Sequence, residues 1–285
     1  MRYEAAETLE EAVELLARAG GGVLPLAGGT DLLAQRRAGQ IDPQGVVDLK
    51  RIPELREIVV DDDGYRVGAA VSGAELGEHP ELLAAWPGVV EAVQLIGSTQ
   101  IQGRASLGGN LCNASPAADS VPALMAAGAV CSVAGPDGRR ELPVEEIVQG
   151  PGQTCLAPGE IVAHFRLGRP GPRSGDAYLR MIPRTEMDIA VVGAGVALRL
   201  DEEGVCTACR VALGAVAPTA LLVPEAADAL VGRRVEAGAL ADLAAAASAA
   251  ARPIDDMRGP AAYRVRVAGV MAKRAALIAA ARAGD

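Results

Sequence analysis

Two glycine-glycine loops, at residues 27–31 and 105–110, constrain this chain more than any other feature of its sequence. Each loop carries a hydroxyl side chain, Thr30 in the first and Ser106 in the second, and Asn110 adds an amide that can donate and accept. Glycine lets backbone amides approach a bound group closely and adopts dihedral angles that other residues avoid. Two interpretations remain open: simple strand-to-helix turns, or two facing loops that together cradle a diphosphate.

The loops match neither of the common nucleotide-binding motifs. Neither loop reads Gly-x-Gly-x-x-Gly and neither is a Walker loop with its lysine, so Rossmann and P-loop assignments fail. Lys50 and Lys273 are the only lysines in the chain. An anionic ligand would therefore be held by backbone amides or by a few arginines.

Composition excludes several classes of protein. Half of the 285 residues are apolar and 22% are charged, which indicates a compact globular chain. A net charge of −9 and a 2% share of aromatic residues argue against nucleic-acid binding, so we expect no such partner. No apolar run reaches the roughly 18 to 20 residues that span a bilayer, so we expect no transmembrane segment. Residues 1–4 lead into an acidic amphipathic segment, and we expect a cytoplasmic protein.

Five cysteines in a chain of this length do not indicate a disulfide scaffold. Cys206 and Cys209 have the spacing of a redox or zinc pair, but no second ligand pair accompanies them. They belong to a predicted strand, in which alternate side chains face opposite sides, so we interpret them as small buried hydrophobic residues. His79 and His164 have no nucleophile pattern nearby. We therefore expect no metal site and no hydrolytic triad, and we assign no catalytic residue.

Element patterns divide the chain near residue 170. The first part mixes helix patterns, at 8–19 and 82–96, with strand patterns such as 23–26, and Asp61-Asp62-Asp63-Gly64 predicts a hairpin turn. Residues 168–175, rich in glycine and proline, are the best linker candidate. Beyond them, strand patterns precede two helix patterns at 240–251 and 263–283, an order that indicates a small α+β unit.

The two loops and the segments after them resemble a known family. Ala27-Gly28-Gly29-Thr30-Asp31, Ser106-Leu107-Gly108-Gly109-Asn110, Ala114-Ser115-Pro116 with Asp119, and residues 256–264 are similar to the FAD-binding medium subunits of molybdenum hydroxylases. This is the xanthine dehydrogenase and aerobic carbon monoxide dehydrogenase group, and the resemblance covers almost the whole chain. It implies an α+β protein: a two-lobed, PCMH-type α/β FAD-binding domain over 1–170, with a lobe boundary near residue 55. A smaller α+β C-terminal domain, with a short antiparallel sheet and helices, would occupy 176–285.

The resemblance also implies site residues. The two loops would line the FAD diphosphate and ribityl chain, Asp119 would hydrogen-bond the cofactor, and Val162 and Arg180 would be an apolar and a basic contact. From the residues alone, the alternative interpretations of these three are a helix cap, a core valine and a surface arginine. Ile189 stands where many relatives carry an aromatic residue near the isoalloxazine, and Gln102-Gly103 replaces a usual Arg-Asn. The implied set is Leu26, Ala27, Gly28, Gly29, Thr30, Asp31, Leu32, Ile96, Ser106, Gly108, Gly109, Asn110, Asp119, Val162, Arg180 and Ile189.

The function implied is that of an oxidoreductase subunit that transfers electrons. FAD, bound non-covalently, would take electrons from a small subunit with two [2Fe–2S] clusters and pass them to an external acceptor. A large molybdenum–pterin subunit would hydroxylate the substrate, and the expected assembly is a dimer of heterotrimers.

Two alternatives stay open at this point. A free-standing FAD oxidase of the same flavin-binding fold would need a substrate pocket and usually holds its flavin through a His or Cys; Cys112, close to Asn110, is a nominal attachment point. A structural subunit with decayed cofactor loops is the third interpretation. The intact Gly-Gly pairs argue against it.

Overall fold

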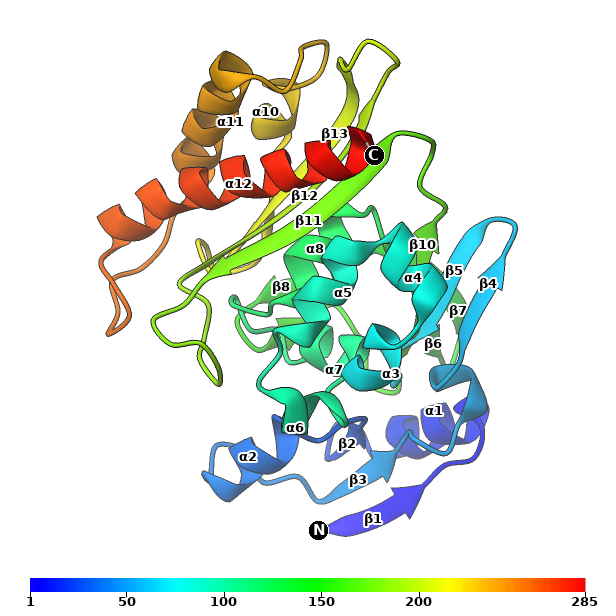
Figure 1. The fold of residues 1–285 in the computed structure, drawn as a ribbon. Helices are drawn as coiled ribbons and strands as arrows, with labels where there is room; N and C mark the ends of the chain where they lie inside the picture. The colour runs from blue at the N-terminus through cyan, green and yellow to red at the C-terminus, as the bar shows by residue number, and fades with distance from the viewer. Residues whose placement is uncertain (285) are drawn as a thin grey trace.

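The computed structural model describes residues 1–284, and its N-terminal part is a small parallel α/β lobe (Figure 1). Its elements are β1 (Arg2–Ala5), α1 (Leu9–Arg18), β2 (Val23–Leu26), α2 (Leu32–Arg37) and β3 (Gly45–Asp48). The strands pair in the order β1-β3-β2, and both pairings are parallel. Parallel strands need crossover connections, which α1 and α2 provide. Thr8 begins α1 as predicted, because its side chain accepts a hydrogen bond from the Glu11 amide.

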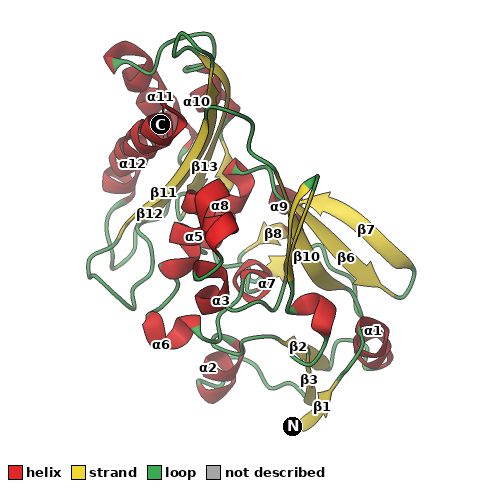
Figure 2. Ribbon diagram, turned by 45° about the vertical axis from the view of Figure 1, so that its right-hand side comes forward, coloured by secondary structure: helices red, strands yellow, loops and turns green. Residues whose placement is uncertain are grey.

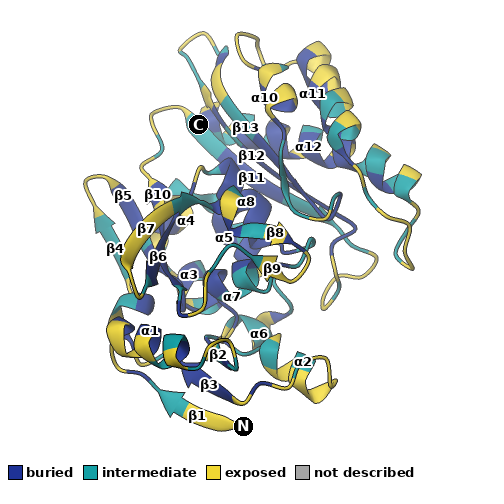
Figure 3. Cartoon of the chain, turned by 180° about the vertical axis from the view of Figure 1, so that it is seen from behind, coloured by how far each residue is buried: buried dark blue, intermediate teal, exposed yellow. Residues whose placement is uncertain are grey.

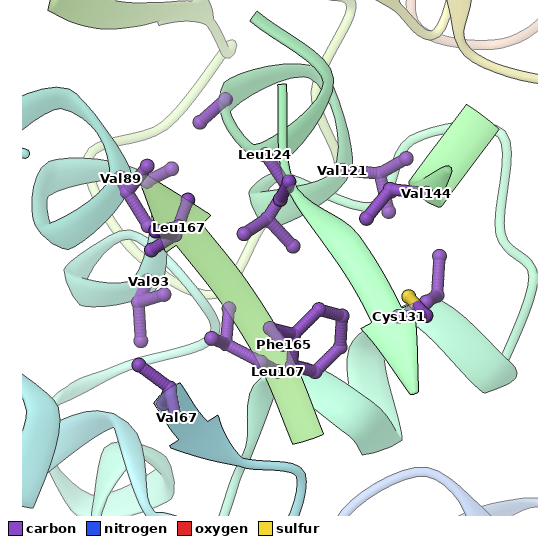
Figure 4. Close-up of a cluster of buried hydrophobic side chains, with 14 of the residues drawn as sticks. Val67, Val89, Val93, Leu107, Val121, Leu124, Cys131, Val144, Phe165 and Leu167 are labelled. Atoms are coloured by element: carbon purple, nitrogen blue, oxygen red, sulfur yellow. The ribbon is translucent and has the colours of Figure 1, made fainter. Parts of the chain in front are cut away.

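The central part is built on a five-stranded antiparallel sheet. Its strands are β4 (Ile58–Asp61), β5 (Gly64–Gly68), β6 (Val130–Gly135), β7 (Gly138–Pro143) and β10 (Ile161–Gly168). Their order is β4-β5-β10-β6-β7, so the last strand in sequence lies in the middle. The turn predicted at Asp61–Gly64 does join β4 to β5. Figure 4 shows Phe165 of β10 against Leu107, and both side chains are fully buried. The second glycine loop, which contains Leu107, therefore packs on this sheet.

Short helices and a small hairpin connect these strands. They are the 3-10 turn η1 (Pro53–Leu55), α3 (Gly73–Gly77), α4 (Pro80–Ala85), α5 (Pro87–Gln94), α6 (Thr99–Gln102), α7 (Leu107–Cys112), α8 (Ser120–Ala126), α9 (Val144–Ile147), β8 (Val148–Gly150) and β9 (Gln153–Thr154). The single helix predicted at 82–96 is wrong: it breaks at Trp86 into α4 and α5. Pro87 causes the break, since proline restricts the preceding residue to extended backbone and begins the next helix readily.

The C-terminal part is a four-stranded antiparallel sheet covered by helices on both faces (Figure 3). Its elements are β11 (Ser174–Met181), β12 (Val192–Leu200), β13 (Cys206–Gly214), β14 (Leu221–Leu222), α10 (Pro224–Asp228), α11 (Ala237–Ala250) and α12 (Ala261–Gly284). Helices α11 and α12 match the two predicted C-terminal helices. They lie on one face of the sheet, while α5 and α8 of the central part lie against the other.

Part of the segment expected to be a linker is instead a strand. Ser174 and Gly175 begin β11 and pair with β12. A Cβ atom on Gly175 would lie 2.2 Å from the Ala279 carbonyl oxygen, so this glycine lets α12 pack directly on the strand. Arg282 of α12 bonds the Asp176 carbonyl at 2.7 Å and the Glu91 carboxylate of α5. The C-terminal helix therefore fastens the third sheet to the central helices.

None of the helices within residues 1–284 is long and apolar enough to cross a bilayer.

A buried arginine on α12 offers a test of this packing. Arg264 is 4% exposed and donates to the carbonyls of Val191 and Ala215, at 3.0 and 3.2 Å. Arg264→Met leaves both carbonyls without this donor, so we expect it to lower the free energy of unfolding by about 3 kcal/mol, measured by urea denaturation. Arg266→Met, on an exposed position of the same helix, is the control and should change it by less than about 0.5 kcal/mol. Equal effects would contradict the role given to Arg264.

Candidate functional site

A cavity of about 650 Å³ lies between the N-terminal lobe and the central part, and both glycine loops line it. Figure 2 shows α7 next to the lobe that carries β2 and α2. A direct bond crosses this boundary: Gln35 of α2 donates to Asn113, at the end of α7, at 2.8 Å. Most of the site residues predicted from the sequence line this cavity. They are Leu26, Ala27, Gly28, Gly29, Thr30, Asp31, Leu32, Ile96, Ser106, Gly108, Gly109, Asn110 and Val162.

The first loop contacts the start of the second loop through backbone atoms. A Cβ atom on Gly28 would lie 2.0 Å from the Arg104 carbonyl oxygen, which no side-chain rotation could relieve. Arg104 in turn donates its Nε to the Gly28 carbonyl at 3.3 Å. Gly29 has φ +79°, in the left-handed region that favours glycine. The fold itself therefore requires glycine at both positions.

The second loop begins α7. The Ser106 side chain accepts from the Gly109 amide at 3.2 Å, and the Gly108 amide donates to the Ala69 carbonyl at 3.0 Å. Gly108 also packs tightly, because an added Cβ would lie 2.7 Å from Ala69. Gly109 differs: an added Cβ would meet only the Ser106 hydroxyl, at 3.2 Å. Its outer side is therefore open space at the cavity wall.

The side chain of Asn110 already uses its acceptor. Its Oδ1 accepts from the amide and the hydroxyl of Ser120 at 3.2 and 2.7 Å, which ties α7 to α8. Its side-chain amide group is left to donate, so Asn110 can offer a ligand two N–H donors and no free carbonyl. Asp31, in the first loop, keeps part of its surface exposed, but the desolvation of its carboxyl at the cavity wall raises the pKa of that group.

Lys50 contacts the first glycine loop, a role that the sequence analysis missed. Lys50 Nζ donates to the Ala27 carbonyl at 2.9 Å and pairs with Asp48 at 2.6 Å. Asp48 in turn accepts from the Tyr3 hydroxyl at 2.8 Å. One of the two lysines of the chain thus fixes the first glycine loop. The Asp48-Leu49-Lys50 pattern at the end of a strand could have indicated this role of Lys50.

Three predicted site residues lie elsewhere. Asp119 and Arg180 form a buried ion pair at 2.7 Å, and Asp119 also accepts from the Tyr178 hydroxyl at 2.9 Å. Burial raises the pKa of Asp119 to about 6, against the opposing pull of Arg180 and Tyr178. The pair joins α8 to β11, and neither residue lines the cavity wall. Ile189 is 49% exposed on the connection between β11 and β12.

Comparison with known proteins identifies the family. Residues 1–170 match the model of the FAD binding domain in molybdopterin dehydrogenase, and residues 177–279 match the CO dehydrogenase flavoprotein C-terminal domain. The chain belongs to the FAD-binding subunits of the molybdenum hydroxylases. The resemblance drawn from the two loops is thereby confirmed, and so are the fold class and the assignment to the oxidoreductases.

Individual relatives extend over most of the chain. The carbon monoxide dehydrogenase medium chain of Afipia carboxidovorans is 35% identical over 282 residues, 99% of this chain and 97% of that one. A putative xanthine dehydrogenase FAD-binding subunit of Escherichia coli is 34% identical over 76% of this chain and 74% of that one. Among solved structures, the reconstituted CO dehydrogenase from Oligotropha carboxidovorans superposes with a TM-score of 0.95 at 33% identity, covering 99% of this chain and 98% of that one.

The cavity suits the cofactor of this family. FAD carries a charged diphosphate between two extended groups, so it needs N–H and O–H donors at one place and apolar walls on either side. The glycine loops supply the donors, and Ile96 and Val162 are apolar parts of the wall. The open side of Gly109 provides room for close approach to a backbone.

Gly109 therefore gives a cleaner test of the site than Gly29, whose positive φ would strain any side chain. We expect Gly109→Val to retain helix content by circular dichroism but to weaken FAD binding by on the order of a hundredfold, because the side chain displaces two charge-assisted hydrogen bonds. Fluorescence titration of the apoprotein with FAD measures this. Gly103→Val is the control, since Gly103 is exposed, has open space around it and does not line the cavity. Unchanged affinity in Gly109→Val would remove the second loop from the site.

Proposed function

We propose that this chain holds FAD non-covalently between its two glycine loops and works as the electron-transfer subunit of a molybdenum hydroxylase. When bound, FAD supplies the redox chemistry by accepting electrons from one partner and releasing them to another. The chain's residues bind the cofactor, orient it and exclude water. The observation that carries this proposal is the single cavity wall shared by both loops within an FAD-binding domain.

Each part of the cofactor has a proposed position. The amides of 27–31 and 106–110 would hold the diphosphate and ribityl chain, aided by the hydroxyls of Thr30 and Ser106. Asp119 and Arg180 would act on the flavin from the β11 side through their buried pair, and Ile189 would lie near the ring. The proposed domain division is 1–170 and 176–285, with the lobe boundary near residue 55. The first sheet ends with β3 at Asp48, before the proposed lobe boundary, and β11 begins at Ser174, two residues before the second proposed domain.

Non-covalent binding is supported by the chemistry of the wall. Cys112 is the cysteine on the wall, among the residues that the structure describes, and burial raises the pKa of its thiol to about 12. A thiol with so small a thiolate fraction is a poor nucleophile for attachment. Neither histidine lies on the wall within this same part of the chain. A covalent flavin oxidase, the second candidate, finds no attachment point here.

The partners we propose are a [2Fe–2S] small subunit and a molybdenum–pterin large subunit, in a cytoplasmic dimer of heterotrimers. A molybdenum cofactor is named for one similar solved structure, the carbon monoxide dehydrogenase from Hydrogenophaga pseudoflava that lacks the Mo-pyranopterin moiety. This chain has an exposed apolar surface suited to a partner, which we call the loop patch: Met187, Ile189, Ile254 and Met257, which are 56, 49, 73 and 93% exposed.

The loop patch lies close to the cavity. Its two loops are joined by an ion pair between Asp188 and Arg258 at 3.5 Å. The Met187 amide donates to the Gly97 carbonyl at 3.2 Å, directly after Ile96 of the cavity wall. A partner on this patch would therefore stand beside the proposed flavin site. Exposed apolar side chains gathered in this way are typical of protein interfaces.

Purification of the chain with and without its genomic neighbours tests the proposal. We expect the yellow absorbance of flavin in the isolated chain, release of FAD by acid, and no substrate hydroxylation until the two partner chains are added. Acid-stable flavin, or oxidase turnover by the chain alone, would favour the free-standing oxidase instead.

The loop patch makes a separate prediction about assembly. Met257→Glu places a charge on a side chain that is 93% exposed, so the fold should tolerate it while binding of the partner chains weakens by on the order of tenfold or more. Co-purification with the tagged small subunit, at matched expression, measures the loss. Val231→Glu, at an exposed apolar position next to α10, serves as the control. If both variants assemble as well as the unaltered chain, the interface lies elsewhere.

A further inference from the structure

A second cavity, of about 400 Å³, lies between the C-terminal sheet and the central helices. Its floor belongs to β11, β12 and β13, and its walls to the break between α4 and α5, the end of α8 and residues 168–171 ahead of β11. Within residues 1–284, it shares no lining residue with the cavity between the glycine loops. Its volume falls in the range of roughly 300–1,000 Å³ that is typical of small-molecule sites.

The pairing of the strands determines which side chains face this cavity. Ala197 of β12 is opposite Asp176 on one side and opposite Arg210 on the other, and directly opposite residues share a face of the sheet. Arg199, two residues further along β12, lies on that same face, and so does Ala208 opposite it. The two alanines thus alternate with the two arginines and leave space between them.

Contacts with the central helices show that this face is the cavity side of the sheet. Arg210 Nε donates to the Met125 carbonyl of α8 at 2.9 Å. Asp176 Oδ2 accepts from the Val89 amide of α5 at 3.2 Å. The cavity is therefore the space that α5 and α8 leave uncovered at one end of the sheet.

A β-bulge beside the cavity holds the Arg199 side chain. Arg199 is opposite Ala208, but the next residue of β12, Leu200, is opposite Cys206. Thr207 is therefore an extra residue in β13. In a regular strand Thr207 would face away from Arg199, yet its hydroxyl accepts from Arg199 Nε and donates to the Arg199 carbonyl, each at 3.2 Å. The bulge thus fixes the guanidinium through Nε and leaves both Nη atoms without a hydrogen bond within residues 1–284.

Hydrogen-bond donors converge in this space. Arg199 Nη1 and Ser174 Oγ lie 3.6 and 3.8 Å from the point where a Cβ atom on Gly171 would stand, so both reach the same open position. Arg210 bonds the Glu145 carboxylate through Nη2, and its Nη1 makes no hydrogen bond in the described part of the chain. Arg199 and Arg210 are diagonal neighbours across two strands, a spacing of roughly 7–8 Å that long side chains bridge. Two guanidinium groups placed in this way suit a phosphate.

Asp176 adds an acceptor at the floor of the cavity. The residue is 4% exposed, and its buried Oδ1 has no hydrogen-bond partner among residues 1–284. Burial raises the pKa of Asp176 to about 6, so at neutral pH the carboxyl is mostly ionised and can accept only. An ionised oxygen left unpaired in this way is costly, and a ligand hydroxyl would satisfy it.

We propose that the second cavity binds a sugar phosphate, either free or as part of a nucleotide. The phosphate accepts hydrogen bonds from Arg199 and Arg210, and a sugar hydroxyl donates to Asp176 Oδ1. Arg169, on the same wall, adds a third positive charge nearby. The site is separate from the flavin cavity, so this proposal does not depend on the function proposed above.

Trp86 makes binding at this cavity directly measurable. It is the only tryptophan of the chain, and it lines the second cavity but not the flavin cavity. Its Nε1 donates to the Gly168 carbonyl at 2.9 Å, which holds the ring in the wall. A change in tryptophan fluorescence therefore locates a ligand here, while isothermal titration calorimetry gives its affinity.

Four compounds are titrated into the full chain: ribose 5-phosphate, AMP, inorganic phosphate and ribose. We expect ribose 5-phosphate and AMP to bind saturably and to change the fluorescence of Trp86. Inorganic phosphate, which lacks the sugar hydroxyls, should bind about tenfold more weakly, and ribose should not bind. Tighter binding of AMP than of ribose 5-phosphate identifies a nucleotide as the ligand, and the reverse identifies a free sugar phosphate.

Two variants complete the design. Arg199→Gln changes an exposed residue, so the fold should tolerate it, and it should weaken binding of ribose 5-phosphate by on the order of tenfold or more. Arg173→Gln is the matched control: Arg173 is an exposed arginine near the same edge, bonds the Asp201 carbonyl and lines neither cavity. It should leave the affinity nearly unchanged.

Three results would overturn the proposal. The first is the absence of saturable binding, or of a change in Trp86 fluorescence, with both ribose 5-phosphate and AMP. The second is inorganic phosphate that binds as tightly as ribose 5-phosphate, which would remove the sugar and the role of Asp176. The third is an equal loss of affinity in both variants, because general charge and not this site would then hold the ligand.

Discussion

The approach of Gly28 to the Arg104 carbonyl determines where the cavity can be. Both groups belong to the backbone. At this point the N-terminal lobe and the central part are in backbone-to-backbone contact, with no side chain between them. Lys50 holds the same loop from behind through the Ala27 carbonyl. On the other side, Gly108 is fixed against Ala69. The cavity is the space that remains beside these contacts, and its wall includes the glycine residues of both loops together with short polar side chains such as Thr30 and Ser106.

This construction explains how an acidic, lysine-poor chain can be suited to an anionic cofactor. The net charge of −9 gives no general attraction, and Lys50 is committed to Asp48 and Ala27. The donors that remain are backbone N–H groups and short side chains. They bind an anion through hydrogen bonds at fixed positions and not through the electrostatic field of a net positive charge. A site of this kind depends on the relative placement of two lobes. Gln35 and Asn113, which join the two lobes by a hydrogen bond, also line the cavity, so they act on the site through the lobe contact as well as through the wall.

The sequence predicted what is local and missed what depends on distant packing. The glycine loops, the helix start at residue 8 and the Asp61–Gly64 hairpin are each specified by a few neighbouring residues, and all are found in the structure. Pro87 already carried the signal that splits the helix predicted at 82–96. Gly175 carried none: it resembles a linker glycine, but it serves the close contact with Ala279 on a helix a hundred residues later. The Asp119–Arg180 pair likewise needs the position of β11 against α8.

Strand periodicity fails for a different reason, which β13 illustrates. The face on which a side chain lies is predicted by counting residues along the strand, because alternate residues face opposite sides. A single extra residue therefore reverses the predicted face of every residue that follows it. Thr207 has no property that marks it as that residue; the bulge becomes visible only when β12 is laid beside it. The first glycine loop, where Gly29 has φ +79°, and the bulge share one property: the backbone departs from regular helix or strand geometry. At each such place the chain brings together groups that regular geometry would separate, backbone groups of two lobes in one case and the Thr207 hydroxyl with the Arg199 guanidinium in the other.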